Sequence, residues 1–162
     1  MTLDEYFGDW IRVIDRTELN KVMNVLNVEY NKFNVFPYKK DVFKAFNLCP
    51  LNNLKAIILS QDPYPDRYNN KPRATGLAFA NNSEIPEKYL SPSLKILKDS
   101  AINLEIPHNC YTFDSTLESW AKQGILLLNS ALTCRENSVG SHIGIWRPFI
   151  VKLITKLSEY YT

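Results

Sequence analysis

Residue types that could together hold a planar base follow short apolar segments of this 162-residue chain. Asp62 comes just after the run KAIILS, Phe79 lies within TGLAFA, and Asn129 ends the run ILLLN. An aromatic ring can stack on a base, a carboxamide can donate and accept at its edge, and a carboxylate can orient water. Taken singly, Asp62 and Asn129 are also typical turn formers, and Phe79 is typical of a core. Their joint occurrence predicts a site for a planar heterocycle.

A basic loop follows the first of these segments. Arg67, Lys71 and Arg73 lie close together with no acidic residue among them. Ser91 and Ser93 stand near the start of a predicted helix, where hydroxyl and backbone N–H groups can bind a phosphate. A solvated loop is the alternative interpretation. Because the loop adjoins the candidate site, we expect these residues to contact a nucleic-acid backbone.

The apolar segments predict a parallel sheet. Residues 55–60 and 125–129 are typical of strands buried on both faces, and 75–80 is a third candidate strand. Ligands of such sheets bind beyond the carboxyl ends of the strands, where Asp62, Phe79 and Asn129 fall. Since the loop after the first strand must face residues from both other strands, we expect the first strand to lie between them.

Helices are predicted on both faces of this sheet, which gives an α/β fold with three α/β/α layers. Residues 1–50 form a helical N-terminal part, with Thr17 as the expected N-cap of its longest helix. Prolines exclude regular structure over 61–73. The predicted helices are 19–33, 38–46, one that opens at Pro92, 115–122, and 145–160 with a buried stripe of Phe149, Ile150, Leu153, Ile154 and Leu157.

Composition indicates one ordinary globular domain, because 45% of the residues are hydrophobic and 22% are charged. The net charge of +2 does not by itself indicate nucleic-acid binding. Cys49, Cys110 and Cys134 form no C-x-x-C pair, which favours a reducing, cytoplasmic location over a disulfide framework or a zinc site. The acidic, amphipathic N-terminus predicts no signal peptide, and no apolar run is long enough for a membrane span.

Four motifs, in this order, resemble those of the family-1 uracil-DNA glycosylases. The segment 60–65 (SQDPYP) is similar to the family's water-activating loop G-Q-D-P-Y-H, and 76–79 (GLAF) to its G-L-x-F strand. Residues 91–94 (SPSL) resemble the P-P-S-L loop, and 126–133 (LLLNSALT) the L-L-L-N strand. The likeness covers roughly residues 54–146 and extends to WAKQG before the last strand and to the segment from Ser141 to Trp146.

The resemblance implies DNA repair by hydrolytic excision of uracil, with the base flipped out of the helix and no metal or organic cofactor. By this likeness Asp62 would orient and activate the attacking water, and the backbone at Gln61 would contact uracil O2. Tyr64 would block the position of the thymine 5-methyl group, Phe79 would stack on the base, and Asn129 would bind its O4 and N3 edge. Ser93 would hold the DNA backbone beside the lesion.

Two features depart from the family pattern. Pro65 replaces the histidine that ends the first motif, as in poxviral relatives, one of which also serves as a polymerase processivity subunit. The later H-P-S-P-L type loop, which supplies a histidine for the uracil anion and a wedge for the base stack, is not found. We therefore expect 1–162 to be a single glycosylase-like domain that is C-terminally incomplete. Neither His142, interpreted as a capping or loop residue, nor His108, interpreted as a surface loop residue, replaces that histidine.

The alternative function is a catalytically weak module of the same fold that binds DNA or a replication protein. Retention of Asp62 and Asn129 favours the enzyme, whereas Pro65 and the absent loop favour the binding module. A nucleotide-binding α/β domain is disfavoured because no G-x-G-x-x-G or G-x-x-x-x-G-K-[ST] motif is present. The expected partner is uracil-containing DNA, with a replication protein left open, and the expected oligomeric state is a monomer.

Overall fold

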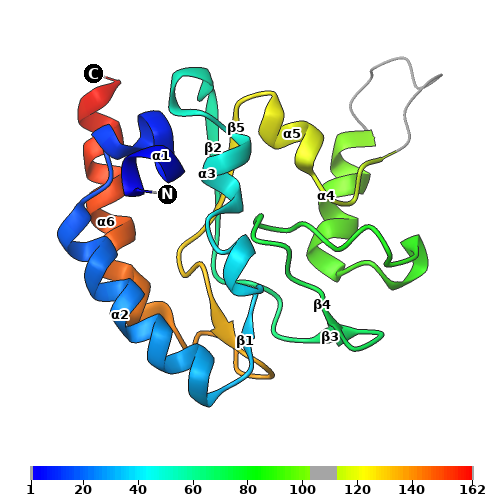
Figure 1. Cartoon of the computed structure of the whole chain (residues 1–162). Coiled ribbons are helices and arrows are strands. Elements are labelled where there is room, and N and C mark those ends of the chain that lie inside the picture. The colour runs from blue at the N-terminus through cyan, green and yellow to red at the C-terminus, as the bar shows by residue number, and fades with distance from the viewer. Residues whose placement is uncertain (1, 103–112, 162) are drawn as a thin grey trace.

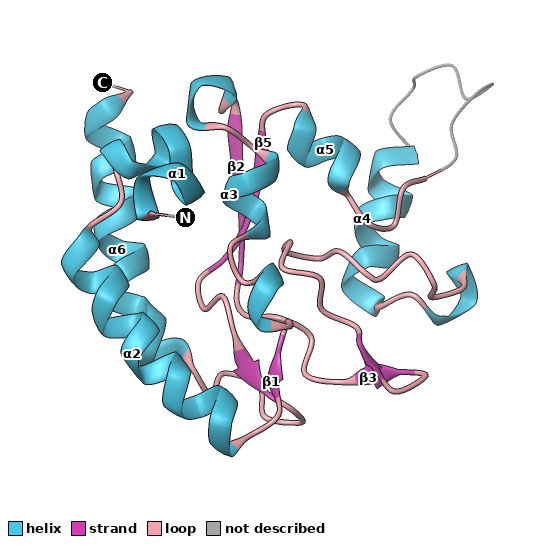
Figure 2. Ribbon diagram, viewed as in Figure 1, coloured by secondary structure: helices cyan, strands magenta, loops and turns pink. Residues whose placement is uncertain are grey.

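The computed structural model describes residues 2–102 and 113–161. At its centre the strands β2 (Ala56–Ser60) and β5 (Ile125–Asn129) run parallel, with Ser60 opposite Asn129. Helices cover both sides of this pair (Figures 1 and 2), and the predicted α/β class is confirmed. The helices are α1 (Leu3–Phe7), α2 (Arg16–Lys32), α3 (Lys44–Leu48), α4 (Pro92–Ile102), α5 (Glu118–Lys122) and α6 (Ile143–Tyr160).

The central strands differ in burial. Leu126, Leu127 and Leu128 of β5 are fully buried, as expected of a strand covered on both faces. Ile57 and Leu59 of β2 are exposed. Within the described residues β2 has β5 as its only strand neighbour, so the core of this chain is built around β5.

The prediction of a third strand over 75–80 is wrong. This segment runs beside β5, where the Ala78 N–H donates to the Leu127 carbonyl at 3.1 Å, but it is not a strand. Gly76 and Phe79 have φ angles of 88° and 65°, which an extended strand does not allow. A Cβ atom at Gly76 would lie 1.9 Å from the Asp41 carbonyl oxygen, so glycine is required there.

The predicted strand order is wrong for the same reason. β5 bonds to β2 on one side and to the segment 75–80 on the other. The strand in the middle is therefore β5 and not the first apolar run. The loop after β2 and the end of the segment 75–80 still meet at the carboxyl end of β5, so the expected site is preserved.

Short antiparallel ladders complete the strands. β1 (Val35–Phe36) pairs with β6 (Cys134–Arg135). β3 (Arg67–Tyr68) pairs with β4 (Lys71–Pro72), so the prediction of no regular structure over 61–73 is wrong for this hairpin. Its two turn residues, Asn69 and Asn70, both have positive φ, the geometry that asparagine tolerates in a two-residue hairpin turn.

Helix boundaries differ from the predicted ones where capping decides them. α2 begins at Arg16 because the Asp15 carboxylate accepts from the Glu18 N–H at 3.0 Å, so Asp15 and not Thr17 is the N-cap. The predicted helix 38–46 divides into a 3₁₀ turn (Lys39–Asp41) and α3. α5 is shorter than predicted, since the Asp114 side chain holds the preceding residues in a turn.

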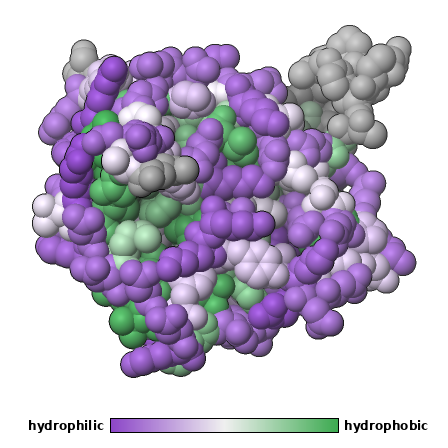
Figure 3. Space-filling view, viewed as in Figure 1, coloured by the Kyte–Doolittle hydropathy of each residue, from purple (hydrophilic) through white to green (hydrophobic). Residues whose placement is uncertain are grey.

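The apolar stripe of α6 is confirmed. Phe149, Ile150, Leu153 and Leu157 are buried, and Ile154 is partly buried against the same core. The face in Figure 3 is mostly hydrophilic, and hydrophobic residues gather between the N-terminal helices and the centre of the molecule. No helix among the described residues is both long and apolar enough to cross a membrane.

Candidate active site

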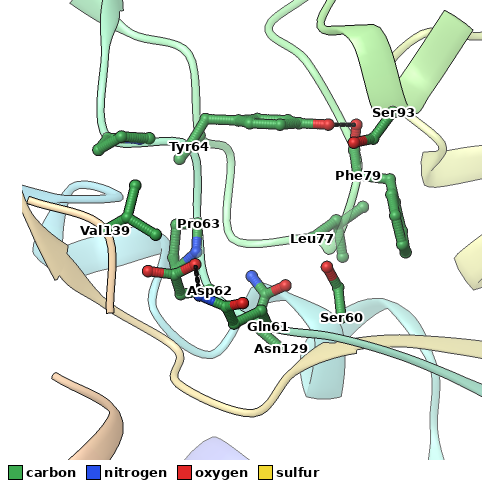
Figure 4. Close-up of a pocket in the computed structure, with 12 residues that line it drawn as sticks. Ser60, Gln61, Asp62, Pro63, Tyr64, Leu77, Phe79, Ser93, Asn129 and Val139 are labelled. Carbon is green, nitrogen blue, oxygen red and sulfur yellow. Dashed lines mark hydrogen bonds between the residues drawn. The ribbon is translucent and has the colours of Figure 1, made fainter. Parts of the chain in front are cut away.

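A pocket of about 240 Å³ opens where β2 and β5 end (Figure 4). Its lining includes Asp62, Phe79 and Asn129, the residues that the sequence predicted would meet. The parallel pairing of Ser60 with Asn129 explains this arrangement, because both strands end at the same level. The complete lining is Ser60, Gln61, Asp62, Pro63, Tyr64, Pro65, Ala74, Leu77, Phe79, Ser93, Asn129 and Val139.

Asn129 carries an unused acceptor in this pocket. The residue is only 5% exposed, and its Oδ1 atom has no hydrogen-bond partner among the described residues. A buried carbonyl oxygen without a donor costs free energy, and such groups in native proteins call for an explanation. A ligand N–H group placed in the pocket would satisfy the Asn129 carboxamide.

Asp62 is held from a distant part of the chain. Its Oδ2 atom accepts a hydrogen bond from the Gly140 N–H at 2.5 Å, and its Oδ1 atom accepts one from the side-chain Nε2 of Gln61 at 3.3 Å. The carboxylate is half-buried at the pocket wall. These contacts fix its orientation while leaving lone pairs free for water.

Tyr64 and Phe79 form the aromatic part of the pocket. The Tyr64 hydroxyl donates to the Phe79 carbonyl oxygen at 3.2 Å. Burial raises the pKa of Tyr64, so its hydroxyl keeps the proton that this bond requires. Figure 4 shows the Tyr64 ring across the pocket from Asp62 and Asn129. The hydrogen bond ties the loop after β2 to the turn at Phe79.

The basic residues of the predicted backbone-binding loop are all paired with acids. Arg67 Nε lies 2.5 Å from the Glu136 carboxylate, and Lys71 Nζ lies 2.7 Å from that of Glu84. Arg73 Nε lies 2.9 Å from Asp66. The pocket lining contains none of these cations. Their charge is therefore locally compensated, and contact with a phosphate remains a prediction.

The two serines that were predicted to bind a nucleic-acid backbone, Ser91 and Ser93, have different surroundings. Ser91 is 3% exposed, and its N–H donates to the Asn81 side-chain oxygen at 2.8 Å. The Asn81 amide nitrogen donates to the Ser91 hydroxyl at 2.8 Å. Ser93 is exposed in the first turn of α4 and lines the pocket. Ser93 is thus available to a ligand, whereas Ser91 stabilises the loop before α4.

The contribution of the turn 138–141 was missed by the sequence analysis. Gly140 supplies the amide that binds Asp62, and Val139 lines the pocket. A glycine directly before the Ser-His start of a helix was the available signal. His142 occupies the N-cap position of α6, as interpreted from the sequence, but its side chain makes no capping bond and is fully buried. His108 lies outside the described residues.

The cysteines do not form a metal or disulfide site in the described part of the chain. Cys49 and Cys134 are free and buried, and burial raises the pKa of Cys49 to about 11 and that of Cys134 to about 12. No group of three or more His, Cys, Asp or Glu side chains in residues 2–102 and 113–161 could hold a metal ion. Cys110 lies outside these residues.

Known proteins resemble the chain in sequence. It is 38% identical over 161 residues to a uracil-DNA glycosylase of Fusobacterium nucleatum, covering 94% of this chain and 66% of that protein. It is 44% identical over 138 residues to a uracil-DNA glycosylase of Mesomycoplasma hyopneumoniae, covering 83% of this chain and 57% of that protein. The chain thus spans less than two thirds of the length of these curated relatives. No family model matches the sequence.

The fold has a solved counterpart as well. The crystal structure of mimivirus uracil-DNA glycosylase superposes with a TM-score of 0.72 at 24% sequence identity, covering 98% of this chain and 63% of that one. The two sequence relatives and this structural neighbour bear the same name. The chain is therefore related in sequence to the uracil-DNA glycosylases and shares their fold.

Proposed function

We propose that this chain carries the base-binding and water-activating residues of a family-1 type uracil-DNA glycosylase. Such an enzyme repairs DNA by flipping uracil out of the helix and hydrolysing its N-glycosidic bond. The observation that carries the proposal is the buried, unpaired Oδ1 atom of Asn129, in a pocket shared with Asp62 and Phe79. We also propose that 1–162 belongs to one domain, in which 1–50 forms the helical N-terminal part.

Base recognition in this proposal rests on the Asn129 carboxamide. Uracil presents an N3–H donor beside its O4 acceptor, so Asn129 Oδ1 would accept from N3–H while Nδ2 donates to O4. Cytosine presents an acceptor at N3 and an amino donor at C4, which reverses both positions. Phe79 would stack on the face of the base, and the backbone at Gln61 would contact O2.

Exclusion of thymine falls to Tyr64. Thymine differs from uracil by a 5-methyl group, and a rigid ring at the pocket wall can reject it by shape. The bond from the Tyr64 hydroxyl to the Phe79 carbonyl supports a fixed ring position. Pro65, next to it, replaces a histidine of the resembling family, so this chain lacks that side chain at the pocket wall.

Hydrolysis would use Asp62. Departure of uracil leaves an oxocarbenium-like sugar, which a nearby carboxylate stabilises while it orients the attacking water. The fixed Gly140 contact supports this role, because a preorganised group needs no rearrangement as the charge develops. His142 is buried within its own hydrogen bonds, so we do not assign it as a donor to the uracil anion.

DNA binding would rely first on Ser93, which is exposed at the pocket rim. Ser91 would act through the loop that it stabilises. For Arg67, Lys71 and Arg73 to bind phosphates, each must exchange a carboxylate partner for a phosphate oxygen. This compensated charge argues against a module that binds DNA by electrostatic attraction alone.

Uracil release from a single-stranded, uracil-containing oligonucleotide tests the proposal. The wild-type chain should release uracil slowly, because no residue is assigned as a donor to the uracil anion, and it should leave a matched thymine oligonucleotide intact. Asp62→Asn should slow release by on the order of 10²- to 10⁴-fold, because it removes the group that activates water. Binding of the oligonucleotide without any release would overturn the proposal in favour of the DNA-binding module.

A further inference from the structure

His142 stands at the start of α6 with both ring nitrogens engaged in the interior. Its Nε2 atom lies 3.2 Å from Oε2 of Glu29 on α2, and its Nδ1 atom lies 2.8 Å from the Thr133 hydroxyl. The Trp146 indole N–H donates to the same hydroxyl at 2.8 Å. We call this set the buried relay; its members are Glu29, His142, Thr133 and Trp146.

The hydrogen-bond pattern assigns each proton of the buried relay. Burial lowers the pKa of His142, which favours the neutral ring with a single N–H. The hydrogen bonds from Arg135 lower the pKa of Glu29 and keep it a carboxylate, so the N–H is on Nε2. Nδ1 then accepts from the Thr133 hydroxyl, which in turn accepts from Trp146. Since each donor has one acceptor, the ring has one orientation.

The buried relay is joined to the turn 138–141 by short connections. His142 directly follows this turn, and the Ile143 N–H donates back to the Gly140 carbonyl at 3.1 Å. On the other side, the Arg135 N–H donates to the Ser141 hydroxyl at 2.8 Å. Gly140 has a φ of 74°, so its own backbone geometry is that of a tight turn. Its amide points to the Asp62 carboxylate.

We propose that the buried relay is a positioning element: it fixes the turn 138–141 so that the Gly140 amide holds the Asp62 carboxylate in its orientation at the pocket wall. Its members are positioning residues, because none of them lines the pocket. The expected consequence for uracil release rests on the proposed function. The coupling of the buried relay to Gly140 and Asp62 does not depend on the proposed function, and it can be measured without catalysis.

A matched control comes from a similar buried bond elsewhere. Trp10 is 1% exposed and Trp146 is fully buried, and the Trp10 indole N–H donates to the Cys49 carbonyl at 2.7 Å. Neither Trp10 nor Cys49 lines the pocket. Trp10→Phe and Trp146→Phe therefore each remove one buried indole hydrogen bond, but only the second removes it from the buried relay.

The test compares amide hydrogen exchange by NMR in the wild-type chain and in Thr133→Val, a change that removes the hydroxyl at the centre of the buried relay. The Gly140 amide should exchange on the order of tenfold faster, as loss of one hydrogen bond's stabilisation allows. The exchange rates of the β2 and β5 amides should rise only by the factor that the measured loss of free energy of unfolding predicts. The side-chain carboxyl carbon of Asp62 should shift at constant pH. Thr133→Ser, which keeps the hydroxyl, should restore the wild-type values.

If Thr133→Val does not fold, the comparison of Trp146→Phe with Trp10→Phe provides the test instead. Faster exchange at Gly140 in Trp146→Phe but not in Trp10→Phe supports the proposal. Exchange at Gly140 that stays at the wild-type rate, or rises only in step with the β2 and β5 amides, overturns it. In an active chain Thr133→Val should lower kcat with KM unchanged. A wild-type chain that releases no uracil would contradict the proposed function and leave the Gly140 result to decide this proposal.

Discussion

Ser60 lies opposite Asn129 at the carboxyl ends of the parallel strands β2 and β5. The loop that carries Asp62 therefore begins directly beside the buried carboxamide, although the two residues are far apart in the sequence. This relationship places a carboxylate and a carboxamide in one pocket. The variants of the pocket should accordingly separate base recognition from hydrolysis.

Asn129→Asp should weaken the preference for uracil over cytosine. The change replaces the Nδ2 donor by a second acceptor, so O4 of uracil loses its partner while the amino group of cytosine gains one. We expect the ratio of excision rates, uracil to cytosine, to fall by roughly 10- to 100-fold. Excision from oligonucleotides that differ only in the target base measures this ratio. An unchanged ratio would mean that Asn129 does not contact the base edge.

Tyr64→Ala should admit thymine, because it removes the ring that we propose blocks the position of the 5-methyl group. The preference for uracil over thymine should fall by on the order of tenfold or more. Tyr64→Phe is the control: it keeps the ring and loses only the bond to the Phe79 carbonyl. If Tyr64→Phe admits thymine as readily as Tyr64→Ala, then ring position and not ring bulk sets the preference.

The sequence predicted the elements whose signal is local. The run ILLLN forms β5 as expected, and Pro92 opens α4. The meeting of Asp62 and Asn129 also followed from the sequence, because the carboxyl ends of parallel strands share one edge. Phe79 was expected there for the wrong reason, since its segment is not a strand. The prediction of a strand over 75–80 failed, because the apolar run does not reveal the close approach of Gly76 to the Asp41 carbonyl.

Long-range polar contacts were equally invisible in the sequence. The basic loop contains no acid, yet Glu136 and Glu84, which pair with Arg67 and Lys71, come from other segments. The buried partners of His142 lie on α2 and next to β6, so its local sequence suggested only a cap. Spacing along a chain shows which residues share an element, whereas these pairs depend on how separate elements pack.

Release of a paired cation should strengthen DNA binding. Glu84→Gln leaves Lys71 without its carboxylate, so we expect about two- to five-fold tighter binding to an oligonucleotide at low salt. Lys71→Gln should weaken binding and reduce the dependence of log affinity on log salt by about 0.7–0.9. Fluorescence anisotropy at several salt concentrations measures both effects. Identical salt dependence in wild type and Lys71→Gln would exclude Lys71 as a phosphate ligand.

Acidification should destabilise the fold through His142. Its pKa in the folded chain is lower than the ordinary value of 6.5, so between these two values the unfolded state binds more protons. The free energy of unfolding should therefore fall as the pH drops below about 6.5. Urea unfolding between pH 8 and pH 5 measures the slope. His142→Asn should reduce the slope and His108→Asn, which removes the chain's other histidine, should keep it; the reverse would contradict the assignment.

The position of uracil against Asn129 is the central claim, and the side-chain amide resonances of Asn129 report on it directly. Titration of the ¹⁵N-labelled chain with uracil, and in parallel with cytosine and thymine, follows the Nδ2 hydrogens by NMR. Uracil should shift these resonances to a saturating value through the bond to O4, while cytosine and thymine leave them in place. Resonances that do not respond to uracil, or that respond equally to cytosine, would contradict the account.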